Sequence, residues 1–202
     1  MAYRRTADIQ ARLDAQRARL LAAAIELVAT SGYAGCSVNA VAARAGVASG
    51  TVYNHFANKS DLLAEVFRTV VRREVDAVRG AATSSGSLTQ RTTAIVETFA
   101  ERALTAPRLA YALLAEPVDP AVDGLRLQFR AAFRDIIADS IAAGVRSAEL
   151  PPQNASLVAA ALVGAIGEAL IGPLVGQPDP ATVPTLVTFA LRSLGASDAA
   201  HA

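Results

Sequence analysis

The segment from Ser49 to Phe56 combines small and hydrogen-bonding residues on the predicted outer face of a short helix. Hydroxyl, amide and imidazole groups form hydrogen bonds with phosphates and with the edges of bases. A carboxylate on such a face would repel a polyanion, and the segment contains none. The residues predicted to point outward are Ser49, Gly50, Thr51, Asn54 and His55. The pattern therefore indicates a surface suited to nucleic acid.

The helices that must position this segment lie directly before and after it. Ser37 is a predicted N-cap for a helix over residues 37–45, and Gly46 ends that helix. Earlier, an amphipathic helix runs from Leu13 to Gly32, and later a longer one runs from about Ser60 to Arg79. Two short helices joined by a tight glycine turn form a helix-turn-helix, whose second helix is presented to the major groove of DNA.

The remainder of the sequence is also predicted to be helical. A small, polar loop covers Gly80 to Ser87, and no segment shows the sustained alternation of a strand. Proline residues separate the apolar stripes that follow. Those stripes predict helices at about 88–105, 108–115, 120–143, 154–171 and 181–194. We therefore expect an all-α fold with a three-helix helix-turn-helix domain at the N-terminus and a helical bundle at the C-terminus.

Composition and charge agree with two units of different purpose. The 202 residues are 52% hydrophobic, which is enough to bury a sizeable core. Residues 1–60 carry an excess of Lys and Arg, whereas the rest of the chain carries an excess of Asp and Glu, and the whole chain has a net charge of +1. This asymmetry suggests an anionic partner at the N-terminal end.

Several classes of function lack their usual residues. Cys36 is the single cysteine and is expected to be a small, semi-buried residue rather than a redox sensor, in a reducing cytosol. His55 and His201 are the two histidines, so we expect neither a metal site nor a bound cofactor. The sequence has no nucleophile elbow and no glycine-rich phosphate loop, and Glu97, Glu101 and Glu168 lack a Glu-x-x-His partner. An enzyme is therefore not expected.

The most apolar stretch, Leu157 to Val175, is interrupted by glycines, Glu168 and Pro173. These interruptions favour a buried or interface helix over a membrane span. The first 20 residues are Arg-rich and lack the apolar run of a secretory signal. We expect a cytoplasmic protein without membrane contact.

The segment Ala22 to Leu63 resembles the DNA-binding domain of the tetracycline-repressor (TetR) family. Its parts follow the family's order: Gly32-Tyr33 ends the first helix, Ala45-Gly46-Val47 forms the turn, and Gly50-Thr51-Val52-Tyr53 begins the reading helix. His55-Phe56, Lys59 and Asp61 through Leu63 then follow at the family's spacing. The C-terminal part is more weakly similar to the ligand domains of some family members.

The resemblance implies roles for individual residues. Ser37, Arg44 and Lys59 would contact phosphates, Tyr53 the DNA backbone, and Ser49, Thr51, Asn54 and His55 the groove. Gly50 would allow close approach to the backbone. This sequence has Ala48 and Ser49 where the family often has Ser and Lys, so Ser49 is expected to take over the capping of the reading helix. The basic arm, residues 1–12, either enters the minor groove or is a solvated tail.

The resemblance also implies a homodimer and a small-molecule effector, expected to be largely apolar. The helix-turn-helix domain is predicted at 13–60, and a ligand-binding and dimerisation domain at 61–202. Apolar walls with a few polar groups suggest a pocket at Phe99, Arg102, Tyr111, Phe129, Arg130 and Phe133. The dimer helices are expected to use Leu162, Val163, Ile166, Gly167, Leu170, Leu186, Phe189 and Ala190, unless that stripe is simply core.

These observations predict a sequence-specific transcriptional regulator, a repressor released from its double-stranded operator by the effector. The alternative is a DNA-binding or protein-interaction module on the same fold that needs no ligand.

Overall fold

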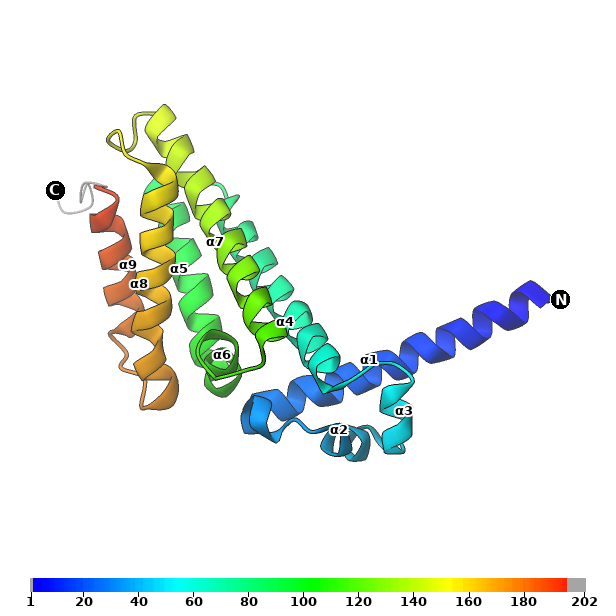
Figure 1. Cartoon of the computed structure of the whole chain (residues 1–202). Helices are drawn as coiled ribbons and strands as arrows, with labels where there is room; N and C mark the ends of the chain where they lie inside the picture. Colours follow the sequence, from blue (N-terminus) through cyan, green and yellow to red (C-terminus); the bar gives the residue numbers. More distant parts are fainter. Residues whose placement is uncertain (1, 196–202) are drawn as a thin grey trace.

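The computed structural model describes residues 2–195, with side chains from residue 7 onward. Within that range the chain folds into helices α1 to α9 and contains no strand, which confirms the predicted all-α class (Figure 1). The first three helices and the start of α4 form one end of the molecule. The remaining helices form a bundle at the other end.

The N-terminal unit consists of α1 (Ala2–Gly35), α2 (Val38–Ala45) and α3 (Ser49–Tyr53). Their apolar faces meet at a core that also receives α4 (Lys59–Ala82) and the buried Ala112 and Val122 of the C-terminal bundle. The fully buried side chains of this core include Leu20, Val28, Val41, Val52, Phe56 and Leu62. The core therefore fixes α3, which buries few residues of its own.

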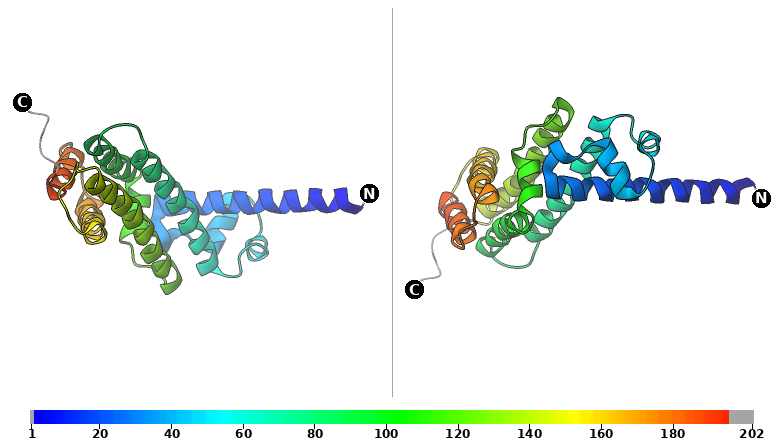
Figure 2. Two further views of the ribbon diagram at one scale, coloured as in Figure 1. Left: turned by 90° about the horizontal axis from the view of Figure 1, so that it is seen from above. Right: turned by 90° about the horizontal axis from the view of Figure 1, so that it is seen from below.

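Helix α1 differs from the prediction at its N-terminal end. The segment 1–12 was expected to be a flexible arm, but the structure continues α1 back to Ala2. Residues 2–12 include three Ala and three Arg, which have high helix propensity. This part of α1 extends away from the body in both views of Figure 2. At its other end, Gly32 interrupts the helical geometry with φ of 67°, close to the predicted stop.

The C-terminal bundle contains α5 (Leu88–Thr105), α6 (Pro107–Leu114), α7 (Pro120–Arg146), α8 (Ala155–Val175) and α9 (Thr182–Ser193). Ser87 caps α5 and exchanges two hydrogen bonds with Gln90, so this helix begins with a complete capping box. The predicted boundaries agree within a few residues. The largest difference is at α8, which continues through Pro173 to Val175.

Helix α4 joins the two ends of the molecule. It begins beside α1 in the N-terminal unit and packs along α5 and α7 in the bundle (Figure 1). Its inner side is lined by Leu62, Val66, Phe67, Val70, Val71, Val75 and Val78, all of them buried. Helix α4 is therefore the helix that packs both in the N-terminal unit and in the bundle.

Helix α8 has the length and apolar composition of a membrane-spanning helix, with a mean hydropathy of 2.0. In the structure it packs against α7 and α6 through one face, which contains Ala159, Leu162, Ile166 and Leu170. Only 28% of its most apolar window is buried, so its opposite face remains exposed. That exposed apolar face of α8 has no packing partner within the described part of the protomer.

Candidate nucleic-acid interface and effector cavity

Helix α3 is a five-residue helix held in place by buried neighbours on its inner side. Val52 within the helix and Phe56 just beyond it are almost completely buried. The turn before α3 is fixed by Gly46, whose φ of 68° is left-handed, and by the Val47 amide, which donates to the carbonyl of Ala42 at 3.0 Å. The reading helix is therefore oriented before any ligand arrives.

The predicted DNA contacts divide into exposed and half-buried groups. Tyr53 is the most exposed aromatic side chain on this face, with 55% of its surface accessible. The other exposed members are Ser37, Arg44, Gly50, Asn54 and Lys59, and the half-buried members are Ser49, Thr51 and His55. The exposed set spans the start of α2, the outer side of α3 and the start of α4.

Two predicted contact residues are engaged by α1. The His55 Nε2 atom lies 2.9 Å from Oε1 of Gln16, which turns the imidazole toward α1 rather than outward. The Arg44 guanidinium donates to Glu26 at 3.0 Å, at an exposed site. A groove contact by His55 requires its bond to break, whereas exposed Arg44 exchanges partners at little cost. Sequence reasoning missed Gln16, which lies far away in the chain.

The caps of the two short helices follow different rules. Ser37 caps α2 as predicted, because its hydroxyl accepts a hydrogen bond from the Ala40 amide at 3.1 Å. The expectation that Ser49 caps α3 is contradicted, since the N-cap is Ala48 and makes no side-chain bond. The Ser49 hydroxyl instead donates to Oδ1 of Asn39 at 2.8 Å. This bond ties α3 to α2.

The surroundings of α3 suit a polyanion. No acidic residue occurs between Glu26 and Asp61, and both of these carboxylates are occupied, Glu26 with Arg44 and Asp61 with the amide of Ala57. At Gly50, no protein atom outside its immediate chain neighbours lies within 4 Å of the place where a Cβ would stand. Packing inside the protein therefore does not require glycine at this position.

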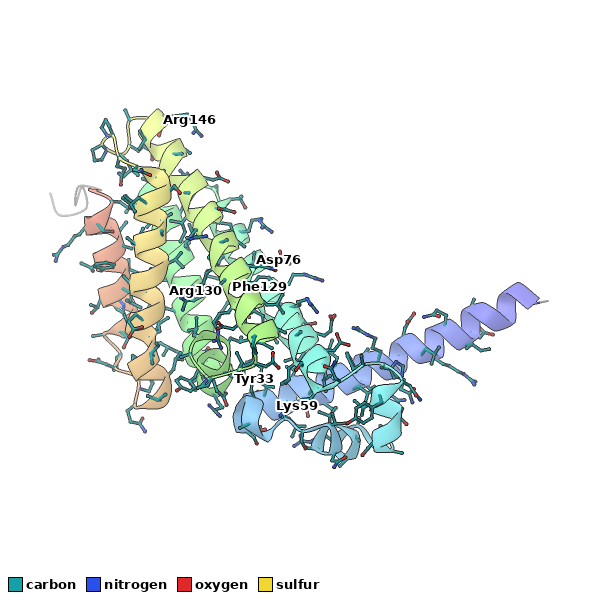
Figure 3. The ribbon with its side chains drawn as sticks, in the orientation of Figure 1. Tyr33, Lys59, Asp76, Phe129, Arg130 and Arg146 are labelled. Carbon is teal, nitrogen blue, oxygen red and sulfur yellow. The ribbon has the colours of Figure 1, made fainter. Side chains whose placement is uncertain are left out.

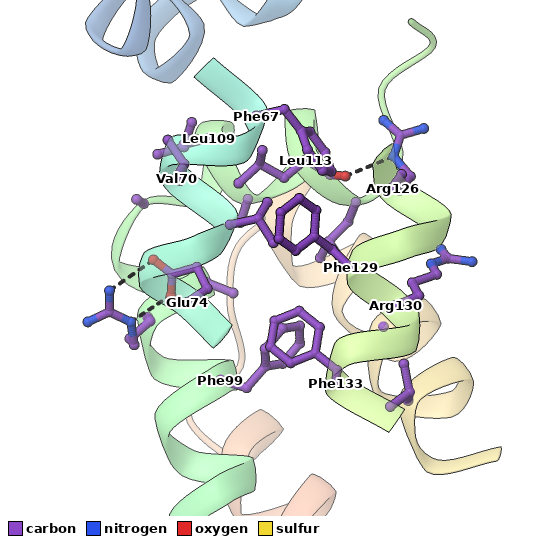
Figure 4. Close-up of a pocket in the computed structure, with 18 residues that line it drawn as sticks. Phe67, Val70, Glu74, Phe99, Leu109, Leu113, Arg126, Phe129, Arg130 and Phe133 are labelled. Carbon is purple, nitrogen blue, oxygen red and sulfur yellow. Dashed lines mark hydrogen bonds and ion pairs between the residues drawn. The ribbon is translucent and has the colours of Figure 1, made fainter. Parts of the chain in front are cut away.

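A second candidate site is a cavity of about 110 Å³ in the bundle, enclosed by α4, α5, α6, α7 and α8 (Figure 4). Its walls are mainly apolar. Of the residues predicted for a pocket, Phe99, Arg102, Phe129, Arg130 and Phe133 line it. Tyr111 does not, and its ring lies instead 5.8 Å from the Arg108 guanidinium carbon.

The wall that α4 contributes to the cavity was not predicted from the sequence. Phe67, Val70, Val71 and Glu74 line the cavity and lie at helical spacing on one face. That spacing was visible in the sequence, but it predicts core as readily as pocket. The wall places the cavity directly against the helix that connects the bundle to the N-terminal unit.

Two smaller cavities continue from the first along α5, α7 and α8. Phe99 and Phe133, with ring centroids 5.4 Å apart, line both the first cavity and a second one of about 40 Å³. A third cavity of about 20 Å³ shares Ile137 with the second. It is lined in part by Ser140, whose buried hydroxyl has no hydrogen-bond partner among the described residues. Together they form an elongated, mostly apolar series.

The charged groups of the first cavity are unequal. Arg102 forms two hydrogen bonds with Glu74, at 2.6 and 2.9 Å, and this pairing raises the pKa of Arg102. Arg126 donates to backbone carbonyls, including that of Leu113 at 2.8 Å. Arg130 is exposed and makes no ion pair with any residue that the structure describes. Its guanidinium points away from the aromatic rings in Figure 4, so its positive charge lies at the outer edge of the cavity.

The residues predicted for dimerisation lie mostly inside the protomer. Leu162, Ile166, Leu170, Leu186 and Ala190 are buried, while Val163 and Gly167 face the cavity. Phe189 is the exception, with 44% of its surface exposed. The stripe is core because α8 is apolar on both sides and packs one of them against α7. The exposed positions on α8 and α9 are Ser156, Leu157, Ala161, Gly164, Glu168, Ala169, Gly172, Val175, Pro184, Thr185, Thr188, Phe189, Arg192 and Ser193.

Other chemistry has little support in the described part of the chain. No group of three or more His, Cys, Asp or Glu side chains is arranged to hold a metal ion there. Cys36 is fully buried, and burial raises the pKa of its thiol to about 11. A thiol in this state is a poor nucleophile.

Comparison with known proteins identifies the N-terminal unit. Residues 20–66 match the family model described as bacterial regulatory proteins, tetR family. The fatty acid metabolism regulator protein of Bacillus subtilis is 42% identical over 50 residues, which cover 25% of this chain and 26% of that protein. The transcriptional activator FasR of Mycolicibacterium smegmatis is 36% identical over 86 residues, covering 43% and 39%. The alignments thus span less than half of these curated relatives.

The similarity of fold extends over nearly the whole chain. The crystal structure of the regulator FadR from Bacillus subtilis in complex with stearoyl-CoA superposes with a TM-score of 0.76 at 18% identity. The superposition covers 89% of this chain and 98% of that one. At this identity the likeness establishes the architecture and leaves ligand and target to the chemistry of the individual residues.

Proposed function

The chain belongs to the TetR family of bacterial regulatory proteins, and from this premise we propose that it is a sequence-specific transcriptional regulator. It binds operator DNA as a homodimer through α3 and releases the DNA when an effector occupies the bundle cavity. The family is one of regulators and not of enzymes. Neither the effector nor the operator follows from the relatives' names alone.

The observation that carries the proposal is the outer face of α3. Gly50 and Tyr53 on this face are exposed, the face has no carboxylate, and buried Val52 on the inner side holds the helix in a fixed orientation. Gly50 leaves room that no protein atom occupies, which suits the close approach of a phosphate backbone. Tyr53 and Asn54 reach outward, and Lys59 adds a cation at the start of α4.

The effector we propose is a long apolar chain with an anionic group. The three cavities suit an extended chain, and exposed Arg130 supplies an unpaired cation at the outer edge of the first. Pockets for small molecules usually measure about 300–1,000 Å³. The first cavity, at about 110 Å³, must therefore widen on binding, which makes affinity depend on the position of α4. The stearoyl-CoA complex of the B. subtilis regulator supports this class of ligand.

Dimerisation is proposed through the exposed faces of α8 and α9. A symmetric operator requires two reading helices about one turn of DNA apart, so a second copy must be held in place. Leu157, Val175 and Phe189 make these faces apolar. Glu168 on α8 and Arg192 on α9 have opposite charges that can pair across a two-fold axis.

A gel-shift titration tests the proposal. The probe is the intergenic duplex upstream of the gene, at several salt concentrations. Wild-type protein should retard this duplex with an affinity that falls steeply as salt rises. Tyr53→Ala should weaken binding by about 10-fold or more and leave the melting temperature unchanged. Leu127→Ala, an exposed position on α7 far from α3, is the matched control and should bind like wild type.

Addition of stearoyl-CoA to the same assay tests the effector. Release of the duplex supports the proposed class, and release by octanoyl-CoA alone would contradict the extended chain. A wild-type protein that ignores every duplex at low salt would refute DNA reading. Tight binding that no acyl-CoA changes would favour the alternative of a ligand-independent DNA-binding module. A reporter gene then distinguishes a repressor from an activator, the role named for the M. smegmatis relative.

A further inference from the structure

The segment between α6 and α7, residues 115–119, contacts α1 in the N-terminal unit and the start of α4, which follows that unit. We call it the α6–α7 connector. It contains two carboxylates, Glu116 and Asp119, which point to different neighbours. Glu116 contacts the end of α1, and Asp119 contacts the start of α4. One short segment therefore holds the N-terminal unit at two places.

Glu116 is a buried carboxylate that receives the end of α1. Only 8% of its surface is exposed, and its two oxygens accept hydrogen bonds from the amides of Tyr33 at 3.2 Å and Ala34 at 3.5 Å. Arg108 on α6 donates to it at 3.3 Å. Tyr33 lies where α1 meets the bundle (Figure 3). The left-handed Gly32 makes this approach possible, because a Cβ there would stand 2.6 Å from Oε1 of Glu116.

Asp119 joins the start of α4 to the start of α7. One of its oxygens accepts from the amides of Ala121 and Val122, both at 3.1 Å, and so caps α7. The other accepts from the hydroxyl of Ser60, in the first turn of α4, at 2.7 Å. The hydrogen bond from Ser60 is the main reason that the pKa of Asp119 is lowered from its usual value.

The connector is also fixed to the walls of the effector cavity. Arg126 on α7 donates to the carbonyls of Ala112 at 3.2 Å, Leu113 at 2.8 Å and Glu116 at 2.9 Å. Both Arg126 and Leu113 line the cavity. Widening of the cavity moves α6 or α7, and this movement reaches the connector through the same hydrogen bonds.

We propose that Glu116 and Asp119 are positioning residues for the N-terminal unit. They transmit a change in the shape of the cavity to α1 and α4. This inference rests on the proposed function and adds the residues that couple its two sites. The two ties act together: Glu116 controls the end of α1, and Asp119 controls the end of α4 that follows α3. Loss of either tie frees the reading helix from the state of the cavity.

Two small changes test the ties separately. Ser60→Ala removes the bond to α4 and leaves Asp119 to cap α7, whereas Glu116→Gln weakens the bonds to α1. Asp139→Asn is the matched control, because this exposed carboxylate lies on α7 and makes no bond to Arg126 or to the connector. For each protein we measure the affinity for the upstream duplex with and without saturating stearoyl-CoA, and the affinity for stearoyl-CoA itself.

In wild type and Asp139→Asn, stearoyl-CoA should weaken DNA binding by the same factor. In Ser60→Ala and Glu116→Gln that factor should fall by about 5-fold or more, while affinity for stearoyl-CoA is unchanged. An unchanged factor in both variants would overturn the proposal. A wild-type protein that binds no duplex would instead refute the proposed function.

A distance measurement tests the positioning without DNA or effector. Spin labels on Ala43→Cys in α2 and Arg134→Cys in α7 report the distance between the N-terminal unit and the bundle. Cys36 is buried and stays unlabelled. Labelled protein is diluted with unlabelled protein. Wild type should give a narrow distance distribution, and Ser60→Ala and Glu116→Gln a broader or shifted one. Identical distance distributions in wild type and both variants would contradict a positioning role. This holds even if Glu116→Gln lowers the stability of the protein.

Discussion

The reading helix and the effector cavity differ in how far apart in sequence their parts lie. α3 and its caps come from residues 37–59, and local bonds such as that from Ser49 to Asn39 fix them. The cavity takes its walls from five helices between Phe67 and Gly167. A surface made from neighbouring residues is specified by local pattern, whereas a cavity depends on how helices pack. The difference also separates what mutation should do to each.

The largest effect on stability is expected at Gly32, where the end of α1 in the N-terminal unit meets Arg108 and Glu116 of the bundle. Gly32→Ala forces a side chain into a φ of 67° and against the Arg108 and Glu116 side chains. We expect a loss of about 2–4 kcal/mol in the free energy of unfolding. Thermal and urea unfolding measure this loss.

Gly50→Ala is the control for Gly32→Ala. It lies in α3 with open space around it, so its stability should equal that of wild type or exceed it by up to about 1 kcal/mol. The same change should weaken DNA binding if the backbone of the duplex comes close. Equal stability of both glycine variants would show that the junction is not constrained as described.

A smaller effect is expected at the exposed face of α9. Phe189→Glu introduces a charge into the apolar face proposed for the dimer, so the dissociation constant of the dimer should rise by about 10-fold or more. Analytical ultracentrifugation measures the change. Leu127→Glu, also an exposed apolar residue, should leave the dimer intact. Dimers that survive Phe189→Glu and dissociate with Leu127→Glu would place the interface on α7.

The smallest effect concerns Cys36, in the core of the reading unit. Because burial raises the pKa of its thiol from 9.0 to about 11, the protonated form is favoured in the folded state. The resulting stability is complete below pH 9 and is lost as pH rises through 11. At pH 8 iodoacetamide should alkylate native protein far more slowly than protein in urea. Equal rates would mean that the N-terminal core opens readily.

Much of the N-terminal unit could be predicted because its determinants are local. Ser37, Gly46 and the apolar spacing of Val41, Val52 and Phe56 specify α2, the turn and α3 without reference to distant residues. The orientation of His55 could not be predicted, since it depends on Gln16 and therefore on the packing of α3 against α1.

The face of α8 proposed for the dimer was harder to predict for a physical reason. Apolar or small residues cover nearly the whole of α8, so periodicity does not reveal which side faces the protomer core. Packing against α7 decides it. The cavity shows the same limitation, because Phe67 and Val70 on α4 have the spacing of ordinary core residues.

The projecting half of α1 has a thermodynamic consequence. Residues 7–15 are exposed, so their helicity depends mainly on intrinsic propensity and on local bonds such as that between Gln10 and Asp14. Helices shorter than about 12–15 residues are marginal in water without tertiary support. In solution this half of α1 therefore exchanges between helix and coil. A partner that binds this half of α1 as a helix must order it, which lowers its conformational entropy and adds the favourable enthalpy of helix formation. Binding is then more exothermic and more sensitive to temperature.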